Sequence, residues 1–519
     1  MWIANAEQSR NLDRQAAERG IGVETLMERA GQAVCDEIGV LLPFSGKVVF
    51  LCGKGNNGGD GFVAARLAKN AGFEVKCLCT SPEEDLGEDA RSQFLRCAEA
   101  VVPVTFASDA SFEKALEDLW MADLIVDALL GTGARGQIEG QILSAIKAAN
   151  ASGTPILSVD IPSGIDCDSG KELGESIRTD TTITFGLPKP YLFQNVGLEH
   201  AGDWKVDSIG FPSELLEQPT PMRLMDKEWI AERVPVRSRG SHKGDSGRLL
   251  IVAGSDKMSG AAALAVRGAM RGGAGLVTLA STPEVCRRVA TQIPECLLMP
   301  LPTVAGAISA EGADMVLEWM DKGNAAVFGP GLSQQDGVGE FFANVWKSWS
   351  LPAVIDADAL NAVGSGTQLP NSPAVLTPHP GEMARLLSKK TDDIERDRFG
   401  AVAECAKRYA KVSILKGVYS LIASTEKPTL VNPTGNSGMA TGGMGDVLSG
   451  LIGALLAQAL YPLDAAALGV YMHGLAGDIC ARRIGPIGYT ASELADALPS
   501  ARVTIVSSCD YDTFSPYLD

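Results

Sequence analysis

The sequence predicts an α/β protein with two domains, each built around a largely parallel β-sheet. Its 519 residues exceed one ordinary core, because a domain usually takes about 100 to 200 residues. Short apolar runs alternate with helix-like runs, which is typical of parallel strands connected by helices. This alternation is interrupted once, between residues 207 and 247, where prolines punctuate a stretch without a long apolar run. The chain also has 57 glycines, an excess that indicates many turns and ligand-binding loops.

The first alternating series fills the N-terminal part of the chain. Apolar residues at helical spacing predict helices within the first 30 residues, and further helices are predicted for residues 62–70 and 83–99. The predicted strands are KVVFLC (47–52), EVKCLC (74–79), LIVDALL (124–130), PILSVDI (155–161) and TTITFG (181–186). Because these short apolar runs are separated by helices, we expect a parallel sheet covered on both faces.

The second series begins at residue 248, after the interruption. Its strand-containing runs are RLLIVAG (248–254), AGLVTLAS (274–281), AAVFGPG (325–331), PAVIDAD (352–358), AVLTPHP (374–380) and VSILKG (412–417). Helices are predicted for residues 259–271 and for the last hundred residues. The two series carry different loop motifs, so they are not repeats. We therefore predict a boundary near residues 217–225, with domains of residues 1–217 and 226–507.

Charge and cysteine content restrict the partners and the compartment. Lys and Arg number 45, Asp and Glu number 63, and the formal charge is −18, so we expect no nucleic-acid and no membrane partner. No apolar run reaches the length of a membrane span. Eleven cysteines without CxxC pairs, behind a start that has no apolar leader, predict reduced thiols in the cytoplasm. Four dispersed histidines are too few for a histidine-rich metal cage.

The loop CGKGNNGGDG (52–61) follows a predicted strand and opens a helix. Gly53, Gly55 and Gly58 match G-x-G-x-x-G, a spacing that places phosphates at a helix N-terminus. The acidic residue that dehydrogenases carry at the end of the next strand is absent, because Thr80 and Ser81 stand there. The loop therefore argues against an ordinary NAD-dependent dehydrogenase. The alternative is a tight strand-to-helix turn.

Two further loops, VDALLGTGARG (126–136) and VDIPSGID (159–166), place an aspartate at the carboxyl end of an apolar strand. Ligands of open α/β sheets bind outside those strand ends. We therefore expect three loops to bring oxygen-bearing side chains into one crevice, namely Asn57, Asp60, Asp127, Asp160 and Ser163. The alternative is that each aspartate only caps a helix.

These loops, together with MERAG (27–31), resemble the NAD(P)HX epimerase domain over residues 1–217. The resemblance implies a Rossmann-like three-layer α/β fold and interconversion of the R and S epimers at C6 of hydrated NADH and NADPH. The substrate-binding residues that it implies are Asn56, Asn57, Gly58, Gly59, Asp60, Gly131, Thr132, Gly133, Ala134, Arg135, Gly136, Gln137 and Asp160. It also implies a potassium ion at Asn57, Asp127 and Ser163, and a catalytic Asp160. Hard oxygen ligands suit such a cation, and a carboxylate beside a carbinolamine carbon can move a proton.

The segment NSGMATGGMGDVLSG (436–450) is the strongest signal in the second domain. Gly442, Gly443 and Gly445 precede Asp446 at the start of an apolar helix. Bare amides and the positive helix end can hold a phosphoryl group, while the carboxylate accepts a proton from the attacking hydroxyl. No G-x-x-x-x-G-K-[ST] segment occurs, so the domain is not a P-loop enzyme. The alternative is a glycine-rich helix start with an aspartate that favours the dipole.

Further loops accompany this segment: SHKGDSG (241–247), GSDKMSGAA (254–262), FGPGL (328–332), DADALN (356–361), TPHPGE (377–382) and ILKGVYS (414–420). The set resembles the ribokinase-like superfamily, and within it the ADP-dependent NAD(P)HX dehydratase, over about residues 226–507. Met444 departs slightly from the family, where a compact residue is common.

The resemblance implies a nucleotide site for ADP or ATP, with Mg²⁺, at Lys416, Gly417, Val418, Tyr419, Ser420 and Gly445. It implies that Ala261, Gly331 and His379 line the pocket of the hydrated nicotinamide, with the catalytic Asp446 at the substrate hydroxyl. On the residues alone, His379 could instead be a packed loop residue and Lys416 a solvated lysine.

The two resemblances together predict a bifunctional enzyme that repairs NADHX and NADPHX, and we expect a homo-oligomer, a tetramer or larger. One alternative is a small-molecule kinase of the vitamin or sugar type, fused to a Rossmann-like binding module. Another is a first domain that only binds a metabolite or a protein.

Overall fold

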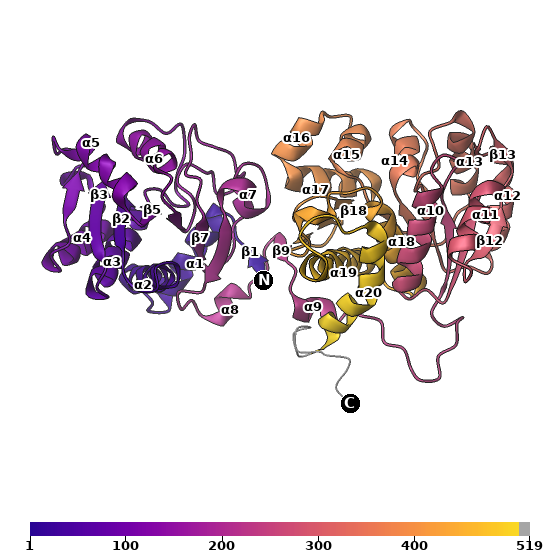
Figure 1. The fold of residues 1–519 in the computed structure, drawn as a ribbon, viewed down its shortest axis with the longest axis horizontal. Coiled ribbons are helices and arrows are strands. Elements are labelled where there is room, and N and C mark those ends of the chain that lie inside the picture. The colour runs from indigo at the N-terminus through magenta and orange to yellow at the C-terminus, as the bar shows by residue number, and fades with distance from the viewer. Residues whose placement is uncertain (508–519) are drawn as a thin grey trace. The chain divides into compact units, whose positions relative to one another are not determined.

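The computed structural model describes residues 1–507. The chain forms two compact units, one of residues Met1–Met222 and one that begins at Arg223 (Figure 1). Each unit is described by itself.

The N-terminal unit is built on a seven-stranded sheet in the order β4-β3-β2-β5-β6-β7-β8, and all neighbouring strands are parallel. The strands are β2 (Lys47–Cys52), β3 (Glu74–Cys79), β4 (Val104–Phe106), β5 (Leu124–Ala128), β6 (Ile156–Val159), β7 (Thr181–Phe185) and β8 (Asp203–Asp207). The strand order reverses between β2 and β5. Ligands of doubly wound sheets bind at such a switch point, outside the carboxyl ends of the strands.

Helices cover both faces of this sheet. Side chains alternate along β2, so that Val48 and Phe50 pack in one apolar cluster, while Val49 and Leu51 pack in another. The first cluster is completed by α2 (Val23–Leu41), α3 (Asn56–Asn70) and α4 (Glu88–Glu99), and the second by α5 (Phe112–Ala115), η2 (Leu116–Met121) and α6 (Gly140–Ser152). The unit further contains β1 (Trp2–Ile3), α1 (Ala6–Glu18), η1 (Glu83–Asp85), η3 (Pro190–Phe193), α7 (Gly197–His200) and α8 (Ser213–Leu216). The predicted three-layer Rossmann-like fold is confirmed.

In the seven-stranded sheet, β4 and β8 escaped the sequence prediction, and so did the break between η1 and α4. Strands β4 and β8 lie at the two edges of the sheet, and none of their residues is fully buried, so they lack the apolar runs that mark the central strands. The single helix predicted for residues 83–99 is instead η1 followed by α4, because the chain is extended at Leu86 before α4 begins.

The second unit has a mixed sheet in the order β9-β20-β19-β18-β17-β16-β15-β10-β11-β12. Its strands are β9 (Met222–Leu224), β10 (Arg248–Val252), β11 (Leu276–Ser281), β12 (Leu297–Pro300), β15 (Ala325–Phe328), β16 (Ala353–Ile355), β17 (Ala374–Leu376), β18 (Val412–Leu415), β19 (Leu421–Ala423) and β20 (Thr429–Val431). Pairing is parallel from β12 to β18 and antiparallel from β18 to β20. The expectation that the last hundred residues are helical is wrong at β19 and β20, whose runs of three residues are too short to show a strand period.

The helices of this unit are α9 (Lys227–Ala231), α10 (Ser259–Arg271), α11 (Pro283–Gln292), α12 (Ala313–Met320), α13 (Asp336–Trp346), α14 (Ala357–Gly364), α15 (Pro380–Leu387), α16 (Thr391–Arg396), α17 (Arg398–Tyr409), α18 (Met444–Ala457), α19 (Pro462–Arg483) and α20 (Ala491–Val506). Short elements β13 (Thr303–Val304), β14 (Ala307–Ile308), η4 (Ala310–Gly312) and η5 (Ser437–Met439) complete it. Helix α18 is buried almost throughout and packs on α10 and on β15 (Figure 1). Its apolar sequence is therefore explained by its central place in the core.

Two expectations from composition can be compared with residues 1–507. No helix in this range is both long and apolar enough to cross a membrane. The ten cysteines of this range are buried free thiols, and Cys509 lies outside the described residues.

Candidate active sites

A cavity of about 650 Å³ lies where the loops after β2 and β5 meet, at the switch point of the N-terminal sheet. The predicted residues that line it are Asn56, Asn57, Asp60, Gly131, Thr132, Gly133, Ala134 and Asp160. The predicted residues that are not among its lining are Gly58, Gly59, Arg135, Gly136 and Gln137. Arg135 is exposed and lies 3.5 Å from Asp166 instead.

The glycines of the loop after β2 serve two different purposes. A Cβ on Gly53 would lie 1.9 Å from the carbonyl oxygen of Leu129, and one on Gly58 would lie 1.9 Å from that of Gly53. These two glycines are required by close backbone packing. Gly55 lines the cavity, and a Cβ there would meet no protein atom within 4 Å. Gly55 is the N-cap of α3, a position that glycine favours, and it leaves open space beside the amides of this loop.

Asp127, in β5, is fully buried and joins two of the loops. Its carboxylate accepts hydrogen bonds from the Ser158 hydroxyl (2.9 Å), the Ser163 amide (2.8 Å), the Ser163 hydroxyl (2.5 Å) and the Leu129 amide (3.3 Å). Burial raises the pKa of Asp127, against the effect of these hydrogen bonds. All four donors are neutral, and Asp127 forms no ion pair within residues 1–507, so its charge has no protein counterion there.

Asn57 is the third member of the predicted potassium site. It is 8% exposed, and its Nδ2 is buried without a hydrogen-bond partner among the described residues. A Cβ on Gly131 would lie 3.4 Å from the Asn57 amide oxygen, so a larger residue at position 131 would press on this side chain. A buried carboxylate without a counterion, a hydroxyl oxygen and an amide oxygen are ligand types that suit an alkali cation.

Asp160 is held in place by a buried lysine that the sequence analysis missed. Its Oδ1 accepts hydrogen bonds from Lys189 Nζ (2.5 Å), Thr184 Oγ1 (3.0 Å) and the Phe185 amide (3.1 Å). The Lys189 side chain is only 3% exposed, so its charge acts in a medium of low polarity. The backbone of Asp160 is left-handed, with φ of 66°, and its carbonyl accepts from the Tyr191 hydroxyl (2.9 Å). Such strain persists only where the surroundings enforce it.

Two more carboxylates face the same cavity. Burial raises the pKa of Asp60 well above its ordinary value, and Asp160 and Asp13 raise it further. The side chain of Asp13 is exposed at the cavity, yet the surrounding protein and Asp160 raise its pKa to about 6, against the effect of Lys189. Asp13 belongs to α1 and was missed because α1 is far from the motif loops in sequence. No motif marks Asp13 in the sequence, where it simply follows Leu12, an apolar residue that is buried in the structure.

The cations of the cavity were also not predicted. Arg10 and Lys54 line it, and neither forms an ion pair within the described part of the chain. In a chain with a formal charge of −18, such cations can hold the phosphates of a nucleotide locally.

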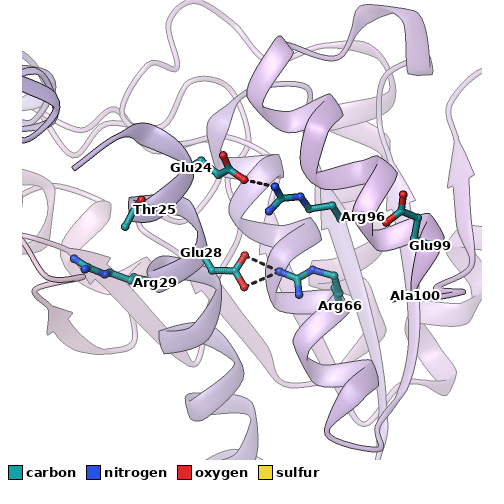
Figure 2. Close-up of a pocket in the computed structure, with 8 residues that line it drawn as sticks. All are labelled: Glu24, Thr25, Glu28, Arg29, Arg66, Arg96, Glu99 and Ala100. Atoms are coloured by element: carbon teal, nitrogen blue, oxygen red, sulfur yellow. Dashed lines mark hydrogen bonds and ion pairs between the residues drawn. The ribbon is translucent and has the colours of Figure 1, made fainter. Parts of the chain in front are cut away.

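A second hollow, of about 720 Å³, lies over α2, α3 and α4 and contains none of the predicted residues (Figure 2). Arg66 pairs with Glu28 at 2.6 Å, and Arg96 pairs with Glu24. Arg66 and Arg96 are therefore matched by carboxylates, and Arg29 donates to the Ile209 and Gly210 carbonyls, which leaves little attraction for an anion.

In the second unit, the loop before α18 is held by a polar network. Asn436 Oδ1 accepts hydrogen bonds from the Gly438 amide (3.0 Å) and the Tyr489 hydroxyl (2.7 Å), and its Nδ2 donates to Asp478 (2.9 Å). The buried His473 lies 3.0 Å from the Met444 carbonyl, and burial lowers its pKa to about 4. A neutral His473 donates to that carbonyl and positions the first turn of α18.

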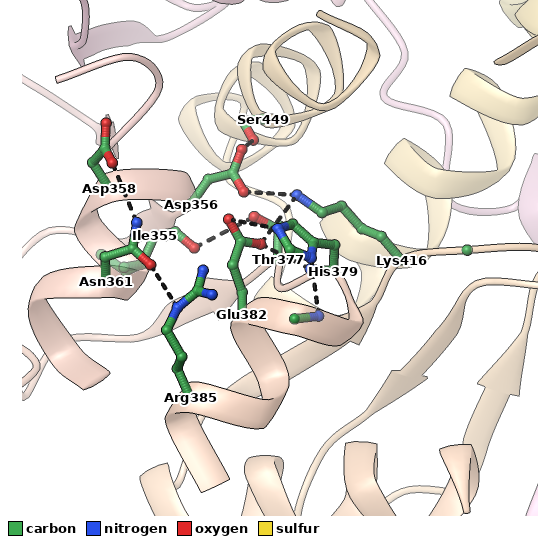
Figure 3. A network of polar contacts seen from close by, with 12 residues as sticks. Ile355, Asp356, Asp358, Asn361, Thr377, His379, Glu382, Arg385, Lys416 and Ser449 are labelled. Atoms are coloured by element: carbon green, nitrogen blue, oxygen red, sulfur yellow. Dashed lines mark hydrogen bonds and ion pairs between the residues drawn. The ribbon is translucent and has the colours of Figure 1, made fainter. Parts of the chain in front are cut away.

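Lys416 lies at the centre of a charged network at the carboxyl ends of β16 and β18 (Figure 3). Its Nζ donates to Asp356 (2.9 Å) and lies 3.7 Å from Glu382. Asp356 also accepts from Ser449 of α18 (2.6 Å). Burial opposes both charges, yet the pKa of Lys416 is raised by Asp356 and Glu382, and that of Asp356 is lowered by Lys416. Both groups are therefore ionised at neutral pH, so Lys416 is not simply a solvated lysine.

Asp446 lies in the first turn of α18, near this network. Burial raises its pKa to about 7, Asp356 raises it as well, and Lys416 acts in the opposite direction. A Cβ on Gly445 would lie 3.5 Å from Lys416 Nζ. The structure thus brings the predicted Asp446, Gly445 and Lys416 together. Asp356 and Glu382 belong to the motifs DADALN (356–361) and TPHPGE (377–382), but these two residues were not predicted as part of the site.

The other predicted residues of this unit are His379, Ala261, Gly331 and residues 417–420. His379 is the N-cap of α15: its Nδ1 accepts from the Gly381 amide (3.0 Å), and its side chain is 51% exposed rather than packed. A Cβ on Gly331 would lie 2.8 Å from that of Ala261, so these two residues are neighbours. Residues 417–420 form a turn in which the Ser420 hydroxyl donates to the Gly417 carbonyl (3.0 Å).

Comparisons with known proteins cover both units. Residues 23–191 match the family model of the YjeF-related protein N-terminus, and residues 249–500 match that of NAD(P)H-hydrate dehydratase. The chain is 39% identical to the bifunctional NAD(P)H-hydrate repair enzyme Nnr of Moorella thermoacetica, over 96% of each chain. It is 38% identical to that of Escherichia coli, over 96% of this chain and 93% of the relative.

The fold comparison agrees for the second unit. A ribokinase-like superfamily protein of Enterococcus faecalis matches 56% of this chain and 98% of its own, with 24% identity and a TM-score of 0.50, which shows the fold alone. The ribokinase-like architecture and the resemblance inferred from the motifs are confirmed. Since two family models match in order and relatives match along nearly the whole length, the chain belongs to the bifunctional NAD(P)H-hydrate repair enzymes.

Proposed function

We propose that the chain converts R- and S-NAD(P)HX into each other in its N-terminal unit and dehydrates S-NAD(P)HX to NAD(P)H in its second unit, at the expense of ADP or ATP. The observation that carries this proposal is the presence of two separate polar sites of different chemistry. One has carboxylates around a cavity at a dinucleotide-type switch point. The other has a carboxylate with a raised pKa at a glycine-rich helix start.

In the epimerase site, the loop after β2 and the start of α3 would hold substrate phosphates, assisted by Arg10 and Lys54. Gly55 supports this assignment, because it leaves room beside the amides. Asp160 would accept and return the hydroxyl proton of the carbinolamine. It suits that role because Lys189, Thr184 and the Phe185 amide hold one carboxylate oxygen, which leaves the other oxygen available.

Potassium would be held by Asn57, Asp127 and Ser163. When bound, it would compensate the buried carboxylate and attract the phosphates of the substrate. A chain of residues 1–222 should therefore melt at higher temperature in potassium than in lithium chloride of equal ionic strength, and Asp127→Asn should remove the difference. Equal melting temperatures in both salts for the unmodified chain would refute the ion site.

In the dehydratase site, the nucleotide would lie on Gly445 and residues 416–420, with Asp446 at the C6 hydroxyl. Asp446 would take the hydroxyl proton as the oxygen attacks the terminal phosphoryl group. Phosphate would then leave C6 and a proton would leave C5, which restores the ring double bond. Mg²⁺ would neutralise the nucleotide phosphates. Within residues 1–507 no group of three His, Cys, Asp or Glu side chains is placed to hold a metal ion, so Mg²⁺ would arrive with the nucleotide.

The test is to incubate the protein with mixed NADHX epimers and ADP, and to follow the absorbance of the reduced nicotinamide and the release of phosphate. We expect one phosphate for each NADH, with both epimers consumed. A stable phosphorylated alcohol without NADH would favour the small-molecule kinase instead.

The fusion has a chemical reason. A dehydratase that accepts only the S epimer leaves the R form behind, and an epimerase in the same chain supplies it. We further propose a homo-oligomer, a tetramer or larger, in the cytoplasm, without nucleic-acid or membrane partners. Light scattering of the purified protein at several concentrations tests the assembly.

A further inference from the structure

The epimerase cavity is lined by more carboxylates than a single proton acceptor requires. Asp13, Asp60 and Asp160 line it together with Lys189. Lys189 directs its Nζ to Asp160 (2.5 Å), Thr184 Oγ1 (2.8 Å) and the Phe185 carbonyl (2.8 Å). All three of its hydrogens are used, so Lys189 can neutralise Asp160 but has none left to donate to a substrate.

Asp13 differs from the other two carboxylates. Its side chain is open to the cavity and forms no hydrogen bond or ion pair within residues 1–507. The other charged groups that line the cavity are Asp60 of α3, Asp160, Lys189, Arg10 and Lys54. A substrate that fills the cavity would displace water from Asp13, which favours its neutral form further.

The chemistry of epimerisation requires an acid as well as a base. In the hydrated ring, C6 carries the hydroxyl group and is bonded to the ring nitrogen N1. Opening this bond produces an aldehyde at C6 and an N–H group at N1, and reclosure on the other face inverts the centre. The opening needs one group that removes the hydroxyl proton and another that protonates N1.

We propose that Asp13 is the second catalytic residue of the epimerase, the acid that protonates N1 while Asp160 accepts the hydroxyl proton; this inference rests on the proposed function of the cavity. The O–H electrons form the C6 carbonyl bond, the C6–N1 bond breaks, and its electron pair takes the Asp13 proton. After rotation about the C5–C6 bond, N1 adds to the aldehyde, Asp13 regains its proton and Asp160 returns the other. No oxidant, reductant or co-reactant is needed.

The raised pKa of Asp13, about 6, supports this assignment. A group with a pKa near the working pH can both give and retake a proton. Asp60 is less suited, because burial raises its pKa well above the ordinary value and it holds its proton more tightly. Asp60 can instead donate a hydrogen bond to the substrate.

The experiment uses the full chain and purified S-NADHX without nucleotide, and follows formation of the R epimer by chromatography. Asp13→Asn should slow this exchange by about 10²- to 10⁴-fold, while dehydration of S-NADHX with ADP by the same sample stays normal. Glu18→Gln, an exposed carboxylate of the same helix, is the matched control and should exchange at the normal rate. Exchange by Asp13→Asn at the normal rate would overturn the inference.

Two further measurements separate catalysis from structure. The kcat/KM of exchange should fall as the pH rises through about 6 in the unmodified chain, since the acid must be protonated, and Asp13→Asn should lose this fall. Asp13→Glu should keep the fall of kcat/KM with rising pH even if Asp13→Asn fails to fold, and an Asp13→Glu exchange rate that does not change with pH would count against the inference.

Ring opening breaks no C–H bond, so exchange in D₂O should leave C5 without deuterium. Deuterium at C5 would show that the exchange passes through reversible dehydration and would overturn the inference. Absence of enzymatic exchange in the unmodified chain would instead refute the proposed epimerase.

Discussion

Asp446 shows how neighbouring groups set the protonation of a single residue. Burial and Asp356 raise its pKa to about 7, and Lys416 limits the rise. A base must be ionised, so the kcat/KM of dehydration should increase as the pH rises through about 7 and level off above it. A pH titration of S-NADHX turnover at saturating ADP measures this, and a rate that stays level from pH 6 to pH 8 would contradict it.

Substitution of Asp446 tests the same residue independently of pH. Asp446→Asn retains the shape of the side chain but cannot accept a proton, so turnover of S-NADHX should fall by about 10²- to 10⁴-fold, or roughly 3 to 5 kcal/mol of barrier. ADP affinity, measured by calorimetry, should persist because amides of the glycine-rich loop hold the phosphates. Lost folding or lost ADP binding would make Asp446 a structural residue instead.

At the scale of elements, the loop between β2 and α3 offers a matched pair of glycines. Gly58→Ala should destabilise the N-terminal unit by about 1 to 3 kcal/mol, because the new Cβ would overlap the Gly53 carbonyl. Gly55→Ala should cost much less than Gly58→Ala, well under about 1 kcal/mol, because no atom lies within 4 Å of the new Cβ and only the N-cap preference of α3 for glycine over alanine is lost. It should nevertheless raise the KM for NADHX, because the methyl group would occupy ligand space. Thermal melts and exchange kinetics on both variants test these two roles. An unchanged KM in Gly55→Ala would show that the loop does not bind NADHX.

At the scale of the whole molecule, each unit contains its own core. One buried cluster is drawn from residues 225–505 and another from residues 34–183. Chains of residues 1–217 and 226–507 should therefore fold separately, each with one cooperative melting transition. The second chain should dehydrate only S-NADHX, and the R epimer should disappear at its uncatalysed rate until the first chain is added. Equal enzymatic consumption of both epimers by the second chain alone would contradict the assignment of epimerisation to the first unit and of S-NADHX dehydration to the second.

The sequence alone was sufficient where the determinants are local. Apolar runs such as residues 47–52 and 248–252 predicted the central strands, because strands buried on both faces must be apolar throughout. The glycines before Asp446 predicted the start of α18, because glycine is preferred where the backbone turns left-handed, as at Gly443 with φ of 91°. Edge strands such as β4 and β8 were missed, because residues that are half exposed carry no apolar pattern.

The tertiary structure decided which charges meet. Lys189 reaches Asp160 from 29 residues away, and Lys416 reaches Asp356 from 60 residues away. No local pattern encodes such pairs. Asp13 enters the epimerase cavity only because α1 is folded beside the loops of the sheet. The protonation of a carboxylate depends on its burial and on charges within a few ångströms, and both are properties of the folded chain. The sequence could therefore identify the loops that carry the chemistry, while only the fold could show which acids, bases and cations act together in them.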